Sequence, residues 1–160
     1  MEFQKIKLHR SEKNRAAVTQ ITLDDDYNVP DYRQDIVKVI KERGELRFDE
    51  VKAMEGAAWI KGSLVFKVLY RSDKQEGKIS CLRGEIPFQE RLNMDGLSEY
   101  DAVHATGDME DLTIGVINSR KLNVRAVIVL TASSEKEVDE ELTCELSDGS
   151  SYEQNIVEKE

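Results

Sequence analysis

The strongest constraint on this chain is a run of apolar residues at every second position between residues 58 and 70. Its members are Ala58, Ile60, Gly62, Leu64, Phe66, Val68 and Tyr70. Because side chains on a β-strand point alternately to opposite faces, this set lines one face of a long strand. The glycine in the middle indicates a bulge or a close backbone approach. The segment is therefore predicted to be a strand with one face on a core.

A second long strand is predicted over residues 121–131. Its alternating apolar residues are Leu122, Val124, Ala126, Ile128 and Leu130. Val127 and Val129 make the opposite face apolar as well, which is typical of a strand inside a sheet. Weaker strand patterns occur near residues 16–23, 45–54, 78–84, 101–116 and 138–146. The polar stretch 71–77 ends in glycine and is typical of a hairpin loop.

One short helix is predicted near residues 31–43. Pro30 precedes it and Gly44 follows it, which is the usual punctuation of a helix. Its apolar residues have helical spacing: Ile36, Val39 and Ile40. Closely spaced strands with short polar turns and a single helix favour a mainly all-β fold. We expect two packed antiparallel sheets, sandwich-like, with this helix at one end.

The length of 160 residues suits one domain with a sizeable core. We expect a single β-rich domain over residues 1–146. After Leu146 the strand pattern fades, and residues 147–160 read as a linker or the start of a following element. The mean hydropathy of −0.53 and the lack of a long apolar run exclude a membrane-spanning helix. The first residues carry no apolar signal segment, so synthesis in the cytoplasm is expected.

Charge and cysteine usage exclude some classes of partner and scaffold. The net charge of −9 argues against non-specific binding to nucleic acid, whose phosphates require positive charge. Cys81 and Cys144 are far apart and form no CxxC motif, so a disulfide framework is not expected, although spacing alone leaves one bridge open. Both lie in predicted strands, where a free cysteine usually behaves as a small buried hydrophobe.

Motifs for catalysis or metal binding are not found. His9 and His104 are separated and lack partners at metal-ligand spacing. The run 24–26 of three aspartates reads as a solvated turn, because consecutive residues point in different directions. The basic cluster of Arg120, Lys121 and Arg125 is too small for a nucleic-acid footprint. We therefore expect no enzyme activity, no cofactor and no metal.

Two stretches carry recognisable content. The first contains Tyr27-Asn28-Val29-Pro30, Ile36-Val37-Lys38-Val39-Ile40, Trp59-Ile60-Lys61-Gly62-Ser63-Leu64 and Val68-Leu69-Tyr70. The second contains Glu85-Ile86-Pro87-Phe88 and the run from Ile117-Asn118-Ser119-Arg120-Lys121 to Ala126. Their order over about residues 16–132 resembles the SPOCS domain of clostridial spore-envelope proteins, including the SipL-like morphogenetic proteins. The resemblance implies a non-catalytic β-rich module, often repeated in tandem and often followed by a LysM domain. No LysM domain is evident in these 160 residues.

The motif residues have structural roles first. Five of them are expected to shape the scaffold: Pro30, Gly62, Asn118, Arg120 and Lys121. Asn118 suits a tight turn, which Arg120 and Lys121 would close by pairing with acidic groups. A proline cannot donate to a central ladder, so Pro87 marks an edge strand or a bend. The candidate interaction edge consists of Tyr70, Ile86, Pro87 and Phe88, with the aromatic residues as core or rim groups.

Three functions compete at this point. The resemblance implies an assembly module of the bacterial spore envelope, in coat or exosporium morphogenesis, within a longer tandem-domain protein. Its partners would be other spore-envelope proteins, such as a coat morphogenetic ATPase, or further SPOCS copies, and an isolated copy would be monomeric or weakly associating. The second function is peptidoglycan or glycan binding, which the aromatic content of 6%, with one tryptophan, does not favour. The third, hydrolysis at an unfamiliar site, has no motif in its support.

Overall fold

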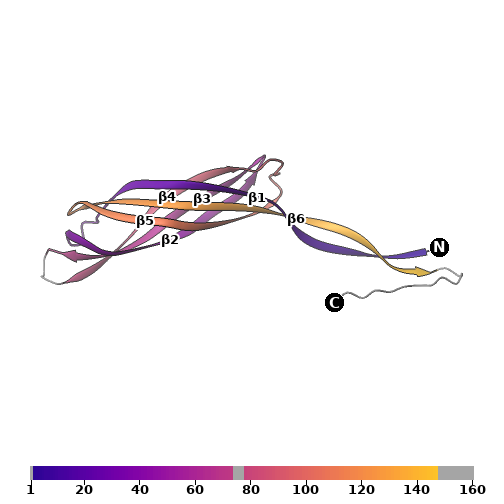
Figure 1. The fold of residues 1–160 in the computed structure, drawn as a ribbon, viewed down its shortest axis with the longest axis horizontal. Coiled ribbons are helices and arrows are strands. Elements are labelled where there is room, and N and C mark those ends of the chain that lie inside the picture. Colours follow the sequence, from indigo (N-terminus) through magenta and orange to yellow (C-terminus); the bar gives the residue numbers. More distant parts are fainter. Residues whose placement is uncertain (1, 74–77, 148–160) are drawn as a thin grey trace. The chain divides into compact units, whose positions relative to one another are not determined.

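The computed structural model describes residues 2–73 and 78–147, which form strands and connections without a helix (Figure 1). The strands in these ranges are β1 (Glu2–Asn28), β2 (Ile36–Met54), β3 (Ala57–Ser72), β4 (Ile79–Asn93), β5 (Ala102–Asn118) and β6 (Lys121–Ser147). The predicted strand over residues 57–70 is β3, and the one over 121–131 is the first part of β6. The described part of the chain contains no helix that is long and apolar enough to cross a membrane.

The strands form two three-stranded sheets. One has the order β2-β3-β4 and the other the order β1-β6-β5, so β3 and β6 are central. β3 pairs antiparallel with both of its neighbours, and β6 pairs antiparallel with β5. The prediction of two packed antiparallel sheets is therefore confirmed. The two long alternating segments occupy the central positions. A central strand is flanked by other strands on both sides, which suits the segments that are richest in apolar residues.

The chain divides into two compact units. The larger unit comprises residues 13–135 and contains the sandwich; β1 and β6 contribute residues to both units. In the smaller unit, Lys5 pairs with Glu141 at 3.1 Å and Arg10 with Glu140 at 2.8 Å, and His9 contacts Asp139. These exposed cross-strand ion pairs join the described parts of β1 and β6 there.

The core of the larger unit lies between the inner faces of the two sheets. Its largest side chains include Tyr70, Phe66, Ile60, Leu64, Leu122, Ile128 and Leu130, all fully buried. Every second residue is buried in this layer from Ala58 to Ser72 in β3 and from Leu122 to Ser134 in β6, as the alternation predicts. Burial of these apolar side chains contributes most of the free energy of folding.

Large and small side chains alternate across the inner face of the β2-β3-β4 sheet. Gly62 on β3 lies between Phe48 on β2 and Phe88 on β4 in the pairing register. The two phenylalanine rings meet edge to face, with centroids 6.3 Å apart and planes at 90°. A Cβ on Gly62 would lie 2.8 Å from the Phe88 ring and 2.4 Å from the Arg47 carbonyl oxygen. The glycine is therefore required by space, with no need for an unusual φ.

A second aromatic row, separated from the first by Leu46, Leu64 and Ile86, has the opposite arrangement. Phe66 on β3 lies between Gly44 on β2 and Gly84 on β4. A Cβ on Gly84 would lie 2.3 Å from the ring of Phe66 and 2.8 Å from that of Tyr27, and these two rings meet edge to face at 5.0 Å. Each bulky ring thus occupies room that the neighbouring glycines leave open.

The predicted short helix over residues 31–43 is wrong. Residues 31–33 form a turn, and Ile36 already begins β2. The pairing of β2 with β3 contains register shifts between Ile36 and Lys38 and between Val39 and Lys41. Each bulge inserts an extra residue and breaks the two-residue period. The apolar residues consequently fall at a spacing that imitates a helix.

We predict that Gly62→Ala destabilises the larger unit by about 1–3 kcal/mol, because the methyl group overpacks a site bounded by backbone. Urea unfolding monitored by circular dichroism measures the change. Gly115→Ala is the matched control, since a Cβ on Gly115 meets nothing within 4 Å. The control should stay within about 0.5 kcal/mol of wild type. Equal stability of the two variants would show that Gly62 is not closely packed.

Candidate functional site

The candidate interaction edge is built on β4, which is an edge strand of its sheet. Pro87 pairs with Ser63 on β3, and the ladder passes through it without a register shift. This is the behaviour of a proline whose nitrogen faces the open side of an edge strand, where no N–H is required. Because backbone N–H groups alternate in direction, the nitrogens of Glu85 and Gln89 face the same open side.

The side chains of the other three edge residues point inwards. Tyr70 lies on the central strand β3, is fully buried, and donates its hydroxyl hydrogen to the Gln34 carbonyl at 3.3 Å. Ile86 and Phe88 lie on β4, and their exposed fractions are 5% and 6%. A strand that pairs with β4 would therefore contact its backbone and its outward side chains, while these apolar groups hold β4 on the core.

A second structured feature is the turn between β5 and β6. The Asn118 side-chain oxygen accepts a hydrogen bond from the Arg120 backbone N–H at 2.9 Å, which closes the turn. The Arg120 guanidinium donates to Asp35 at 3.0 Å and to three backbone carbonyls, those of Val29, Pro30 and Arg33, at 2.7–3.2 Å. Backbone bonds from Val29 to Arg120 and from Ile36 to Ser119 flank this cluster. Arg120 thus fastens the connection between β1 and β2 to the β5–β6 turn.

The aspartate run 24–26 lies in strand β1 and not in the expected turn, and two of its carboxylates contact the first residues of β6. Asn123 donates to Asp24 at 2.9 Å and to Asp26 at 3.3 Å, and Lys121 lies 3.5 Å from Asp26. No group of three or more His, Cys, Asp or Glu side chains that could hold a metal ion occurs in residues that the structure describes.

The outer face of the β2-β3-β4 sheet carries a three-membered charge cluster. Arg47 on β2 bonds both carboxylate oxygens of Glu85 on β4, at 2.9 and 3.1 Å, and also bonds Asp49 at 3.0 Å. The hydrogen bonds from Arg47 lower the pKa of the Glu85 carboxyl, and those same bonds raise the pKa of the Arg47 guanidinium. The paired arginine and glutamate stay charged over the whole neutral range.

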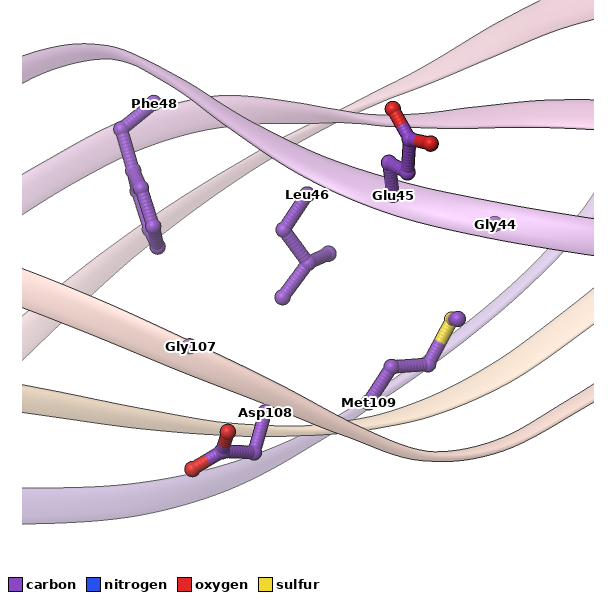
Figure 2. A pocket seen from close by; sticks show the side chains of 7 residues that line it. All are labelled: Gly44, Glu45, Leu46, Phe48, Gly107, Asp108 and Met109. Atoms are coloured by element: carbon purple, nitrogen blue, oxygen red, sulfur yellow. The ribbon is translucent and has the colours of Figure 1, made fainter.

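A groove opens between β2 and β5, which lie side by side (Figure 2). It has a volume of about 430 Å³, and its lining residues are Gly44, Glu45, Leu46, Phe48, Gly107, Asp108 and Met109. The apolar side chains of Leu46, Phe48 and Met109 point into the space between the two strands (Figure 2). A Cβ on Gly107 would lie 2.7 Å from Leu46, so the missing side chain leaves the room that Leu46 fills.

The sequence did not reveal this groove. Gly44 reads as the end of a helix, and Gly107 belongs to a weak strand pattern far away in the chain. A signal was nevertheless present, since Gly44, Leu46 and Phe48 have a period of two. Most of that alternation lies in the strand predicted near residues 45–54, but the sequence does not show that β5 lies beside it.

Cys81 corrects a further expectation. The sequence places it in a strand as a small buried hydrophobe, but it is a free cysteine on the outward face of β4 and is exposed. β4 buries its even-numbered residues from Leu82 to Phe88, and side chains alternate between the two faces of a strand, so Cys81 faces solvent. The side chain of Cys144 lies outside the described side chains.

The fold defines a two-sheet β-sandwich module. Comparison with known families gives a match to the model described as SipL, SPOCS domain, over residues 35–117. The match covers slightly more than half of the chain and spans β2 to β5, so the chain belongs to the SPOCS domain family. Membership associates the chain with sporulation. No curated protein and no solved structure matches it.

We predict that Arg120→Lys lowers the free energy of unfolding by about 1–3 kcal/mol, because an ammonium cannot reproduce the planar fork that reaches Asp35 and the carbonyls. Urea unfolding measures the loss, and faster amide exchange at Val29 and Ile36 would place it at the turn. Arg125→Lys on β6 is the control, since Arg125 is exposed, and it should change stability by less than about 0.5 kcal/mol. Indistinguishable variants would contradict a fastening role for Arg120.

We predict that the Arg47–Glu85 pair makes stability depend on pH in the acid range. The pKa of Glu85 is lower in the folded chain than its ordinary value of 4.5. The contribution of ionised Glu85 to the free energy of unfolding is therefore fully present above pH 4.5. It is lost as the pH falls through the lower pKa that Glu85 has in the folded chain. The free energies of unfolding of wild type and Glu85→Gln, measured by urea unfolding, should differ most at neutral pH and converge in acid. Glu99→Gln in the exposed β4–β5 connection is the control; a constant difference across pH would refute the prediction.

Proposed function

We propose that this chain is a non-enzymatic protein–protein assembly module of the bacterial spore envelope, part of a longer tandem-domain protein that acts in coat or exosporium morphogenesis. The match to the SPOCS domain over residues 35–117 carries the proposal. It covers the whole β2-β3-β4 sheet together with β5. The partners are other spore-envelope proteins, such as a coat morphogenetic ATPase, or further SPOCS copies.

The open side of β4 supplies the means of attachment. An edge strand presents unpaired N–H and C=O groups, and an extended partner segment pairs with them by strand addition. Outward side chains of β4 such as Glu85 and Gln89 lie beside that edge and give the contact its specificity. The rigid core under Ile86 and Phe88 keeps the edge straight, which limits the entropy lost when a partner binds.

Two features limit self-association through the same edge. Pro87 interrupts the row of donors near the middle of β4, and a proline on an edge hinders pairing with an identical strand. The net charge of −9 adds repulsion between copies. An isolated copy is therefore monomeric or weakly associating, and tandem copies gain strength by raising the effective concentration of each weak site.

The test is co-purification of the tagged chain from sporulating cells, with wild type and two variants of Gln89. Gln89→Pro removes one more edge-facing N–H, whereas Gln89→Thr keeps it and preserves strand propensity. We predict that wild type and Gln89→Thr retain spore-envelope proteins and that Gln89→Pro retains much less, at unchanged circular dichroism.

One outcome would contradict the assembly role, and another would contradict attachment through the edge of β4. Retention of isolated peptidoglycan by wild type, without envelope proteins, would establish a glycan-binding module instead. Equal retention of envelope proteins by Gln89→Pro and Gln89→Thr would leave the assembly role standing but would move the contact away from the edge of β4.

A further inference from the structure

The outer face of the β2-β3-β4 sheet concentrates positive charge at one end. Three consecutive outward rows, read from β2 across β3 to β4, contain Lys38–Arg71–Ile79, Lys41–Leu69–Cys81 and Arg43–Lys67–Arg83. The basic patch is defined by their cations: Lys38, Lys41, Arg43, Lys67, Arg71 and Arg83. All of these side chains are exposed, and the three rows contain no carboxylate. Such a patch is unexpected in a chain with a net charge of −9.

The basic patch is poorly neutralised. Among the described residues, its one ion pair within 4 Å joins Arg43 to Glu45 at 3.6 Å. By contrast, Arg47 in the middle of the same face is paired with Glu85 and Asp49, and Lys52 towards the other end is paired with Glu50. Arg43, Lys67 and Arg83 lie directly opposite one another on adjacent strands. Like charges in that position disfavour the sheet, so an anionic ligand would relieve the repulsion.

A shallow apolar pocket lies within the basic patch. It has a volume of about 240 Å³ and is lined by Lys41, Arg43, Lys67, Leu69 and Cys81, together with Glu42. Leu69 is 40% exposed, and the neighbouring Ile79 is 57% exposed. Glu42 pairs with the inward-facing Val68, so its side chain alternates to the inner face of the sheet. The pocket therefore combines an apolar floor with a cationic rim.

This combination selects a particular kind of ligand. The apolar floor accepts an aliphatic side chain, and carboxylates on either side of that side chain reach the lysine and arginine groups. A single-stranded nucleic acid would need aromatic side chains on which its bases stack, and the three rows contain none. The acidic remainder of the chain also repels a long polyanion. A short acidic protein segment satisfies both parts of the site.

The acidic segment of this chain is not the natural occupant. Residues 137–141 contain four carboxylates, and Asp139, Glu140 and Glu141 already contact the basic residues of β1 within the smaller unit. If these three carboxylates moved to the basic patch, their ion pairs with β1 would be broken and similar ion pairs would form, so little free energy would be gained. We therefore look for the charge complement in another protein.

We infer that the basic patch and its pocket bind an acidic segment of a partner protein, in which carboxylates flank an aliphatic side chain. This inference rests on the proposed function and identifies the chemistry of a partner. The outer face of the sheet is used, so the site is separate from the open side of β4 and can be occupied together with it. Its affinity falls as the salt concentration rises, because exposed ion pairs are screened.

The experiment is an NMR titration of the ¹⁵N-labelled chain with the synthetic peptide Glu-Glu-Leu-Glu-Glu. We expect shifts centred on Lys41, Lys67, Leu69 and Cys81, and weaker binding at high salt. The double variant Lys41→Glu with Lys67→Glu should bind at least about fivefold more weakly, because two exposed ion pairs are replaced by repulsion. Leu69→Thr keeps every charge and tests the apolar floor, and the peptide Glu-Glu-Gly-Glu-Glu tests the same contact from the ligand side.

The matched control is Lys52→Glu with Lys61→Glu, which changes the same charge on β2 and β3 at the other end of the same face. It should bind like wild type. Equal weakening by both double variants, or equal binding of the leucine and glycine peptides, would overturn the inference in favour of a non-specific charge effect. Tighter binding of a short oligothymidylate than of the peptide would assign the site to nucleic acid.

These results are separable from a failure of the proposed function. If the peptide does not bind while wild type still retains envelope proteins from sporulating cells, the inference about the basic patch is wrong and the assembly role stands. If the peptide binds the patch but no envelope protein is retained, the site is real and the assembly role is wrong.

Discussion

The pairing register of β2, β3 and β4 organises both faces of their sheet. It places Gly62 between Phe48 and Phe88, and Phe66 between Gly44 and Gly84. A shift by one residue would turn every inner side chain of one strand to solvent. A shift by four would place Phe48 or Phe88 against Phe66 in one direction, and Gly44 or Gly84 against Gly62 in the other. The matching of large rings to facing glycines therefore holds the sheet in a single register. That register in turn allows the core to be close-packed.

The same register arranges the outer face. Outward residues of β2, β3 and β4 form rows, so cations that are distant in sequence become neighbours in the basic patch. The rows also bring Arg47 beside Glu85, which neutralises the middle of the face while the end near Lys41 stays positive. Packing on one side of the sheet thus decides the charge pattern on the other. We propose that a module of this kind presents two surfaces to partners, the open side of β4 and the outer face of its sheet.

Three features could not be predicted correctly from the sequence, each for a different physical reason. The bulges near Lys38 and Lys41 destroy the alternation of β2, and the resulting spacing of Ile36, Val39 and Ile40 is that of a helix. Cys81 was misplaced for a different reason, because the weak pattern of its strand did not show which face was buried. The turn of Arg120 has the residues that suit closure, yet its acceptors are mainly backbone carbonyls, which no sequence pattern reveals.

The sequence by itself determined the all-β class, the two central strands and the family, because side-chain period and motif order are properties of the chain alone. It also limited Pro87 to an edge strand or a bend, since a central ladder does not tolerate a missing N–H. Only the tertiary structure decided which strands are neighbours, and with them the groove between β2 and β5 and the basic patch. Both are formed by residues from separate strands, so they exist only once pairing has fixed which distant side chains share a face.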